Sequence, residues 1–297
     1  MKIIDPHLHL FNLNKGDYHW LNDDKPPFWS DKHLINKAFT ESDLVLDTLL
    51  ELVGFIHIEA GFDNQQPWRE LKWLEKHCQR PFRAIAAIDL TLNSKAFQQQ
   101  LSMLIAHPSF VGIRHILDEQ VFSLLTNKQV IDNIDTLNKF SFIFEVQMQF
   151  DNHIAVNALY KTITNNTNLT FIINHAGFPT TSVKSVEWQR WQHNLLKLST
   201  FSHVAIKCSG WEITDRNYQT AWMSETLTEI FNIFDIHKIM LASNFPLCLF
   251  NNSSYQDYWL SLLNTNFFQT LNQQQKSALV YDNTLYWYQL KIVQPTT

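Results

Sequence analysis

The sequence predicts a single (β/α)8 TIM barrel, an α/β fold in which eight parallel strands close on themselves inside a ring of helices. Three observations lead to this prediction. Short apolar runs alternate with longer segments of helical period along the whole chain. Eight such pairs follow one another, which is the pattern of a closed parallel barrel. No linker rich in Pro, Ser or Gly divides the 297 residues, so we expect residues 1–297 to form one domain.

The predicted strands are short runs rich in apolar residues, and the predicted helices carry apolar residues at helical spacing. The strands are Lys2–Leu10, Val53–Ala60, Phe82–Asp89, Phe110–Leu117, Phe142–Met148, Leu169–Asn174, His203–Cys208 and Lys238–Ala242. The helices are Glu41–Glu51, Trp68–Cys78, Ala96–Ala106, Lys128–Lys139, Ile154–Thr164, Trp188–Leu198, Ala221–Phe234, Tyr255–Leu263 and Gln273–Tyr288. Five of the six glycines fall inside these strands or at their ends, where the backbone turns sharply or packs closely.

One long irregular segment, Asn12–Lys37, follows the first strand and is rich in aromatic and charged residues. Active sites of such barrels lie at the carboxyl ends of the strands, in the loops that follow them. We therefore expect residues 12–37 to lie over the barrel mouth and to form part of the substrate pocket.

Composition excludes several classes of protein. The net charge is -5 and the pI is about 6.2, so nucleic acid is not an expected partner. The three cysteines lie far apart without a Cys-x-x-Cys spacing, which argues against a disulfide framework or a zinc ribbon. No secretory signal and no apolar run of membrane-spanning length occur. We expect a cytoplasmic protein that binds a small-molecule substrate and does not bind a membrane. Whether it forms a homodimer is left open by the sequence.

The first strand places His7 and His9 two residues apart. Side chains alternate in a strand, so both rings, and the carboxylate of Asp5, are expected on one face. Two parallel imidazoles can bind one metal ion or together polarise one carbonyl. A pair of histidines on a merely polar strand face is the alternative.

Further polar residues stand near the carboxyl ends of the other strands. They are His57, Glu59, Arg114, His115, Glu145, Gln147, Gln149, His175, Lys207 and Asn244. Barrel interiors are normally filled by branched apolar side chains, and buried polar groups are costly without partners. So many at one end therefore indicate a wet, functional mouth.

The motifs that carry these residues also resemble those of a known family. They are Asp5-Pro6-His7-Leu8-His9, Tyr18-His19-Trp20-Leu21, Gly112-Ile113-Arg114-His115, His175-Ala176-Gly177-Phe178-Pro179, Lys207-Cys208-Ser209-Gly210, Ser243-Asn244-Phe245-Pro246-Leu247-Cys248 and Asp282-Asn283-Thr284 with Tyr288. In this order they resemble the amidohydrolase superfamily, in the branch of L-fuconolactonase, L-rhamnonolactonase and 2-pyrone-4,6-dicarboxylate lactonase. The resemblance covers nearly the whole chain.

The resemblance implies that His7, His9, His175 and Asn244 are catalytic, and that the three histidines hold one divalent metal ion, with zinc best matched to such a set. A metal-free mechanism, in which imidazoles act as donors, stays open. The chain departs from the family at Asn244, where an aspartate is usual. An amide cannot accept a proton from water at neutral pH. Either Glu59 or Glu145 is then the base, or a metal-bound hydroxide replaces it, or the site is weakened.

The remaining polar residues at the mouth are candidates for substrate binding. They are Arg114, His115, Glu145, Lys207, Glu59 and Trp20. The planar fork of Arg114 suits a carboxylate or a hydroxyl-rich substrate. It is almost as well explained by an internal ion pair with Glu145 or Asp89. We interpret His57 as a hydrogen-bonded core residue.

The resemblance implies a hydrolase of the carboxylic-ester class that acts on a small cyclic ester, above all a sugar-acid lactone, by attack of water on its carbonyl. The alternative within the superfamily is a metal-dependent amide or C–C hydrolase or a decarboxylase. A third hypothesis is a barrel that has lost most of its catalysis and binds a small acid. Asn244 favours that hypothesis, whereas the intact polar strand ends count against it.

Overall fold

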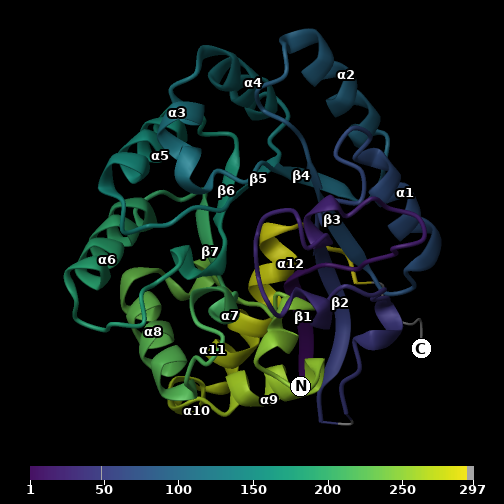
Figure 1. Cartoon of the computed structure of the whole chain (residues 1–297). Coiled ribbons are helices and arrows are strands. Elements are labelled where there is room, and N and C mark those ends of the chain that lie inside the picture. The colour runs from purple at the N-terminus through teal and green to yellow at the C-terminus, as the bar shows by residue number, and fades with distance from the viewer. Residues whose placement is uncertain (48, 293–297) are drawn as a thin grey trace.

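The computed structural model describes residues 1–47 and 49–292. Eight strands form one parallel sheet in chain order, and each strand pairs with the next. Helices follow one another around the outside of these strands, as Figure 1 shows. The strands are β1 Lys2–Leu8, β2 Glu51–Ile58, β3 Phe82–Ala87, β4 Phe110–Arg114, β5 Ile143–Val146, β6 Thr170–Ile173, β7 Val204–Cys208 and β8 Ile239–Leu241. The predicted single-domain (β/α)8 barrel is confirmed.

The barrel closes between the first strand and the residues that follow the last one. The backbone N–H of Asn244 donates to the carbonyl of His7 over 2.8 Å, and the N–H of His9 donates to Phe245 over 2.7 Å. Below this seam, a π-helical turn η8 (Ala278–Asp282) packs against both β1 and β8. The seam therefore holds together two elements that carry candidate site residues.

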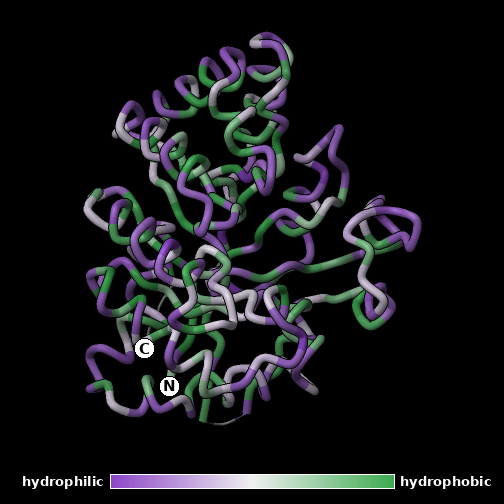
Figure 2. Tube along the Cα trace, turned by 60° about the vertical axis from the view of Figure 1, so that its left-hand side comes forward, coloured by the Kyte–Doolittle hydropathy of each residue, from purple (hydrophilic) through white to green (hydrophobic). Residues whose placement is uncertain are grey.

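The helices form the outer layer and bury one face each. They are α1 Trp68–His77, α2 Ser94–Ile105, α3 Val121–Leu125, α4 Lys128–Asn138, α5 His153–Asn165, α6 Val186–Ser199, α7 Trp211–Thr214, α8 Thr220–Ile233, α9 Tyr255–Leu263, α10 Asn266–Thr270, α11 Gln273–Ser277 and α12 Asn283–Trp287. Hydrophobic and hydrophilic residues alternate along the outer coils in Figure 2. Side chains of Asn93, Asn152 and Ser185 cap the first turns of α2, α5 and α6. None of the described helices is long and apolar enough to cross a membrane.

The predicted helix Glu41–Glu51 is wrong. A capping box between Thr40 and Asp43 supports only the 3-10 turn η3 (Glu41–Asp43), and β2 already begins at Glu51. Of the expected apolar face, Leu44 and Leu52 are buried, the latter within β2, whereas Val45 and Leu49 are 63% and 72% exposed. These residues therefore form no common buried stripe. Thr48, also assigned to that face, lies outside the described residues.

The predicted last helix, Gln273–Tyr288, runs without a gap from α11 through the π turn η8 into α12, which ends at Trp287. Just after the π turn, the side chain of Asn283 donates to the carbonyls of Ile236 and Ile239, both over 2.7 Å. The segment thereby fixes the entry to β8 and places Tyr288 under the barrel.

An apolar layer fills the lower half of the barrel. Its members are Ile4, Ile56, Ile58, Ile85, Ile143, Ile172, Ala205, Met240, Tyr288 and Leu290. Gly112 makes room for this layer, because a Cβ at that position would lie 2.3 Å from the carbonyl oxygen of Ile143. Arg114, Glu145 and Lys207, nearer the carboxyl ends of their strands, are buried polar residues, so the candidate site has an apolar floor.

Candidate active site

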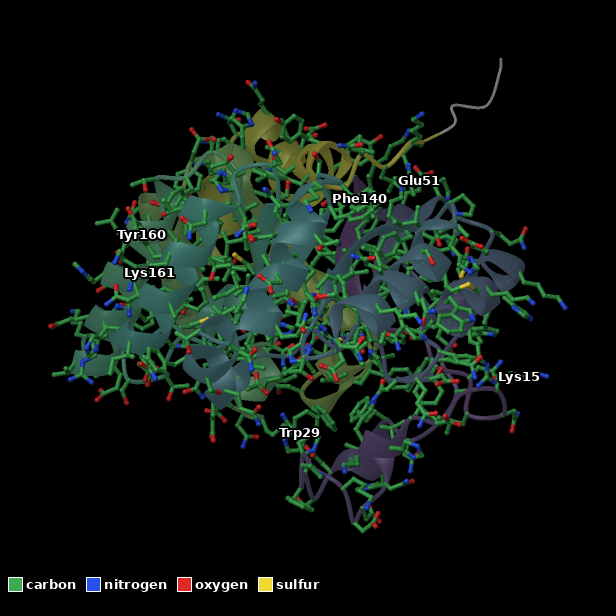
Figure 3. The ribbon with its side chains drawn as sticks, turned by 90° about the horizontal axis from the view of Figure 1, so that it is seen from above. Lys15, Trp29, Glu51, Phe140, Tyr160 and Lys161 are labelled. Carbon is green, nitrogen blue, oxygen red and sulfur yellow. The ribbon has the colours of Figure 1, made fainter. Side chains whose placement is uncertain are left out.

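Residues 12–37 cover the carboxyl end of the barrel. Figure 3 shows Trp29 on the side of the molecule opposite to Glu51, where β2 begins. The indole N–H of Trp20 donates to the carbonyl of Ala60, which follows β2, over 2.8 Å. The guanidinium of Arg216 lies 4.7 Å from the ring of Trp29 and pairs with Asp31 at 2.7 Å. The segment is thus tied to residues that follow β2 and β7.

Three histidines form one cluster beneath this cover. The ring of His7 lies 5.1 Å from that of His9 and 4.6 Å from that of His175, measured between centroids. Their exposed fractions are 0%, 6% and 3%, so the cluster is nearly sealed from solvent. The structure therefore brings together the three histidines that the sequence placed at the ends of the first and sixth strands.

The backbone near His175 is shaped to hold its ring. His175, Ala176, Gly177 and Phe178 all have positive φ angles, which turns the chain sharply after β6. On the neighbouring segment Gly210 has φ +70°, and a Cβ there would lie 2.4 Å from Nδ1 of His175. A glycine at position 210 therefore leaves the space that the imidazole fills.

Burial sets the charge state of the cluster. Desolvation lowers the pKa of His7, His9 and His175 well below the usual value, and the cations Lys207 and Arg114 add to this effect. All three are therefore neutral at pH 7. Nδ1 of His9 donates to the carbonyl of Ile58 over 2.8 Å, which leaves its Nε2 as an acceptor.

Asp5 does not share the face of the two histidine rings. Its carboxylate accepts from the hydroxyl of Tyr255 in α9 over 3.0 Å and from the backbone N–H of Ser243 over 3.1 Å. The pairing of β1 is irregular between Asp5 and Leu8, and this irregularity breaks the alternation that the sequence analysis assumed. Burial raises the pKa of Asp5 to about 6. Asp5 therefore stabilises the seam between β1 and the residues after β8, and it does not join the histidine cluster.

A buried ion pair lies between the histidines and the apolar floor. Nζ of Lys207 is 2.5 Å from Oε2 of Glu145, and both side chains are fully buried. The hydroxyl of Tyr288 donates to the other oxygen of Glu145. Desolvation lowers the pKa of Lys207 to about 8, although Glu145 opposes this shift. Lys207 is thus a positive charge held close to His7 at neutral pH.

Arg114 belongs to an internal network. Its Nε donates to Oε1 of Glu59 over 2.7 Å, its Nη2 to the carbonyl of Glu59 over 2.9 Å, and its Nη1 to Gln147 over 3.0 Å. The expected internal partners, Glu145 and Asp89, are wrong, because Glu59 fills that role. Desolvation raises the pKa of Glu59, and Arg114 counteracts that rise. Most of the guanidinium fork is therefore already occupied.

Two residues predicted near the site have contacts elsewhere. His115 is only partly buried, and its Nδ1 lies 3.3 Å from the backbone N–H of Leu90, on the side of the β3–α2 loop. It does not join the histidine cluster, because it alternates with the inward-facing Arg114. His57 bonds to Glu70 of α1 over 3.0 Å, as expected for a core histidine. His57 and Glu59 therefore have partners on different sides of the barrel wall.

Asn244 pairs with a carboxylate that the sequence analysis did not single out. The amide Nδ2 donates to Oε1 of Glu212, at the start of α7, over 2.6 Å. Both residues are fully buried. On its other side Asn244 lies next to His9 and partly opposes the fall in the pKa of that histidine. Desolvation raises the pKa of Glu212 to about 7, and the hydrogen bond from Asn244 opposes the rise.

Several buried polar atoms at the mouth have no hydrogen-bond partner among the described residues. They include both ring nitrogens of His7, both amide atoms of Asn174, Oε2 of Glu212 and Oδ1 of Asn244. Buried polar groups normally find partners, because a missing hydrogen bond costs about 1–3 kcal/mol. This concentration at the ends of β1, β6, β7 and β8 indicates a place where water or a polar ligand binds.

The predicted metal site is not assembled. Across residues 1–47 and 49–292, no group of three or more His, Cys, Asp or Glu side chains is arranged to hold a metal ion. The charges that act on His7 come from Lys207 and Arg114, both cations, and position 244 supplies a neutral amide. As arranged in this structure, His7, His9 and His175 do not form the expected ligand set, so their rings would have to move to bind one ion together.

Comparisons with known proteins agree with this architecture. The family model described as "Amidohydro_2: Amidohydrolase" matches residues 4–290. The uncharacterized protein y4mH of Sinorhizobium fredii is 25% identical over 300 residues, which are 97% of this chain and 98% of that protein.

Solved structures share the fold at low identity. An amidohydrolase from Burkholderia multivorans with bound zinc is 17% identical, with a TM-score of 0.79 over 98% of this chain and 100% of that one. A probable 2-pyrone-4,6-dicarboxylic acid hydrolase from Acinetobacter baumannii with bound citric acid is 16% identical, with a TM-score of 0.68 over 97% and 100%. At these identities the likeness establishes the barrel and leaves the chemistry to the residues of the site.

Proposed function

The chain belongs to the amidohydrolase family, and we propose that within this family of hydrolases it cleaves a small cyclic ester, a sugar-acid lactone, by attack of water on the ester carbonyl. One observation carries the proposal. A sealed cluster of neutral histidines lies beside a buried cation, at a mouth lined by unpaired donors and acceptors. Such a site suits a neutral carbonyl whose oxygen becomes negative during the reaction.

Lys207 and His7 are positioned to stabilise that negative charge. Nζ of Lys207 has three N–H donors, of which one faces Glu145 at 2.5 Å and another the carbonyl of Pro6 at 3.3 Å. The third donor and an N–H of His7 are free for the carbonyl oxygen of the lactone. In a buried site this stabilisation is stronger than in water.

The unpaired atoms favour a hydroxylated ring over a plain ester. Asn174 offers both a donor and an acceptor, Asn244 offers an acceptor, and Nε2 of His9 offers another acceptor. A sugar hydroxyl donates one hydrogen bond and accepts others, so it can satisfy such a mixed set. Loss of one hydroxyl then leaves a buried group unpaired, and this penalty is the basis of specificity.

A panel of sugar-acid lactones tests the proposal, with acid release as the readout and an unsubstituted lactone of equal ring size as the control. We expect hydrolysis of at least one sugar-acid lactone and much slower turnover of the unsubstituted ring. Activity on none of the panel would contradict the proposal. Parallel assays with amides and aromatic carboxylates then test the amide, C–C and decarboxylase alternatives, and ligand binding without turnover tests the weakened barrel.

Each assay is repeated after treatment with a chelator, and the zinc content of the purified protein is measured. Because the three histidines are not arranged as a ligand set, we expect the rate to change little on chelation. A loss of activity that returns with added zinc would show instead that His7, His9 and His175 rearrange around a metal ion, which would supply a nucleophilic hydroxide.

A further inference from the structure

Hydrolysis of an ester needs a group that accepts a proton from water, and the usual position for it carries Asn244 in this chain. Other carboxylates in the barrel are already engaged. Glu145 is paired with Lys207 and Tyr288, and Glu59 is paired with Arg114. Each of these pairs holds its carboxylate against a cation, which weakens it as a base.

Glu212 differs from these carboxylates in its contacts. Its Oε1 accepts one hydrogen bond from Nδ2 of Asn244, over 2.6 Å, and its Oε2 has no partner among the described residues. The side chain is fully buried. An unpaired carboxylate oxygen in such a place is a strong acceptor for a water molecule.

The same hydrogen bond fixes the orientation of Asn244. Because Nδ2 is committed to Glu212, Oδ1 points away from that carboxylate, and it too lacks a partner within the described ranges. Asn244 neighbours His9 on that side. The amide and the carboxylate thus form one unit with two unpaired acceptors, and its Asn244 end lies beside His9 of the histidine cluster.

We propose that Glu212 is the general base of this enzyme and that Asn244 holds the attacking water beside it. The pair then does together what one aspartate does at position 244 in the family that the sequence resembles. The inference rests on the proposed lactone hydrolysis, since it names the proton acceptor for that reaction.

The proton and electron balance is simple. As the water oxygen forms a bond to the lactone carbonyl carbon, one water proton moves to Glu212, and the carbonyl electrons move to the oxygen near Lys207. When the tetrahedral intermediate collapses, the ring C–O bond breaks and the alkoxide takes the proton from Glu212. The product is the open hydroxy acid, and Glu212 is again ionised.

The surroundings of Glu212 allow it to exchange a proton near neutral pH. Burial raises its pKa, while Asn244 and the cation of Arg216 lower it. The other titratable groups that face it are Tyr218, Cys248 and Tyr258, whose own pKa values are raised, so they stay uncharged. None of these three neighbours is a carboxylate that could compete with Glu212 for the proton.

Replacement of the base tests the inference. Glu212→Gln keeps the shape and the contact to Asn244 but accepts no proton, so kcat should fall by about 10²–10⁴-fold with a small change in KM. In wild type, kcat should rise with pH through about 7, and the variant should lose this limb. Glu75→Gln is the control, since Glu75 bonds to His107 and Ser109 on the outer side of the barrel. A kcat within a few-fold of wild type would overturn the proposal.

Two further measurements keep the result decisive. If Glu212→Gln does not fold, Glu212→Asp replaces it, and retention of the limb at lower kcat supports the base. Infrared difference spectra of wild type against Glu212→Gln follow protonation of this carboxyl without any substrate. A protonated band that disappears near pH 7 supports an acceptor role even if no lactone is turned over. A band that persists at pH 9 would refute it.

Discussion

Replacement of Asn244 by aspartate probes the Asn244–Glu212 pair most directly. From the sequence alone, Asn244→Asp either restores a base, with a gain of roughly 10²–10⁴-fold, or changes turnover modestly if a metal ion activates the water. The structure predicts a third result, because the new carboxylate oxygen would stand 2.6 Å from Oε1 of Glu212. Two ionised carboxylates at this distance repel each other by about 6 kcal/mol at an effective dielectric constant of 20.

This repulsion corresponds to about 4–5 pKa units, so the Asn244→Asp variant should keep one proton on the pair at neutral pH. A single shared proton leaves one negative charge, as in wild type. We therefore expect turnover at pH 7 to change modestly, because one ionised carboxylate remains to accept a proton. The second deprotonation of the pair should appear only in more alkaline solution.

Stability against pH gives the matching assay. In wild type the pKa of Glu212 is about 7 in the folded state against 4.5 in the unfolded state. The folded protein binds more protons between these values, so this group costs about 3 kcal/mol of stability as pH rises from about 4.5 to 7. Asn244→Asp should extend the loss above pH 7, and Glu212→Gln should remove it.

The double variant Asn244→Asp/Glu212→Gln is the matched control, because it exchanges the amide and the carboxylate and keeps a single ionisable group. Its free energy of unfolding in urea should follow pH as in wild type. Asp5, whose pKa is raised to about 6, adds the same slope in all four proteins and cancels in their differences. Four parallel pH curves would show that the pair is not coupled and would refute this reasoning.

Two further substitutions test how the site is held. Gly210→Ala should displace the ring of His175, because its Cβ would lie 2.4 Å from Nδ1 at a φ of +70°, and we expect kcat to fall at least tenfold. Gly54→Ala, whose Cβ would meet Pro81 and Leu290 beside the apolar floor, serves as the comparison. An unchanged kcat in Gly210→Ala would show that the ring position is not critical. Arg114→Ala should lower the free energy of unfolding by about 3–5 kcal/mol, because it leaves the buried carboxylate of Glu59 without its ion-pair partner. A raised KM at unchanged stability would instead make Arg114 a substrate contact.

The barrel was predictable because each strand corresponds to a short apolar run that can be recognised from neighbouring residues alone. Each apolar run is bounded by polar or glycine residues, and parallel strands buried on both faces need little else. The helix expected at Glu41–Glu51 does not form because its apolar residues do not share one buried face. Leu44 and Leu50 are buried, whereas Val45 and Leu49 face solvent. Helical periodicity predicts a helix only where tertiary packing uses the apolar face.

The histidine cluster was also accessible to sequence reasoning, since strand ends meet at one rim of a barrel whatever the loops do. The hydrogen-bond and ion-pair partners of the side chains inside the rim could not be predicted in this way. The sequence offers Glu145 or Asp89 as internal partners of Arg114, beside a substrate contact, whereas Glu59, just after the end of β2 at Ile58, is the carboxylate that pairs with it. Asp5 was misplaced by an irregularity of β1 that carries no residue signature.

Glu212 shows where such reasoning stops. It stands directly after Lys207-Cys208-Ser209-Gly210-Trp211, and its acidity was the one available signal. Acidic residues also favour the first turn of a helix, which explains a glutamate at this place without any chemistry. What distinguishes it is a contact to Asn244, 32 residues away, and complete burial. An amide at position 244 can donate to an ionised carboxylate, whereas an ionised aspartate cannot, so Asn244 is compatible with an ionisable partner beside it. Asn244 and Glu212 are therefore best understood as one hydrogen-bonded unit.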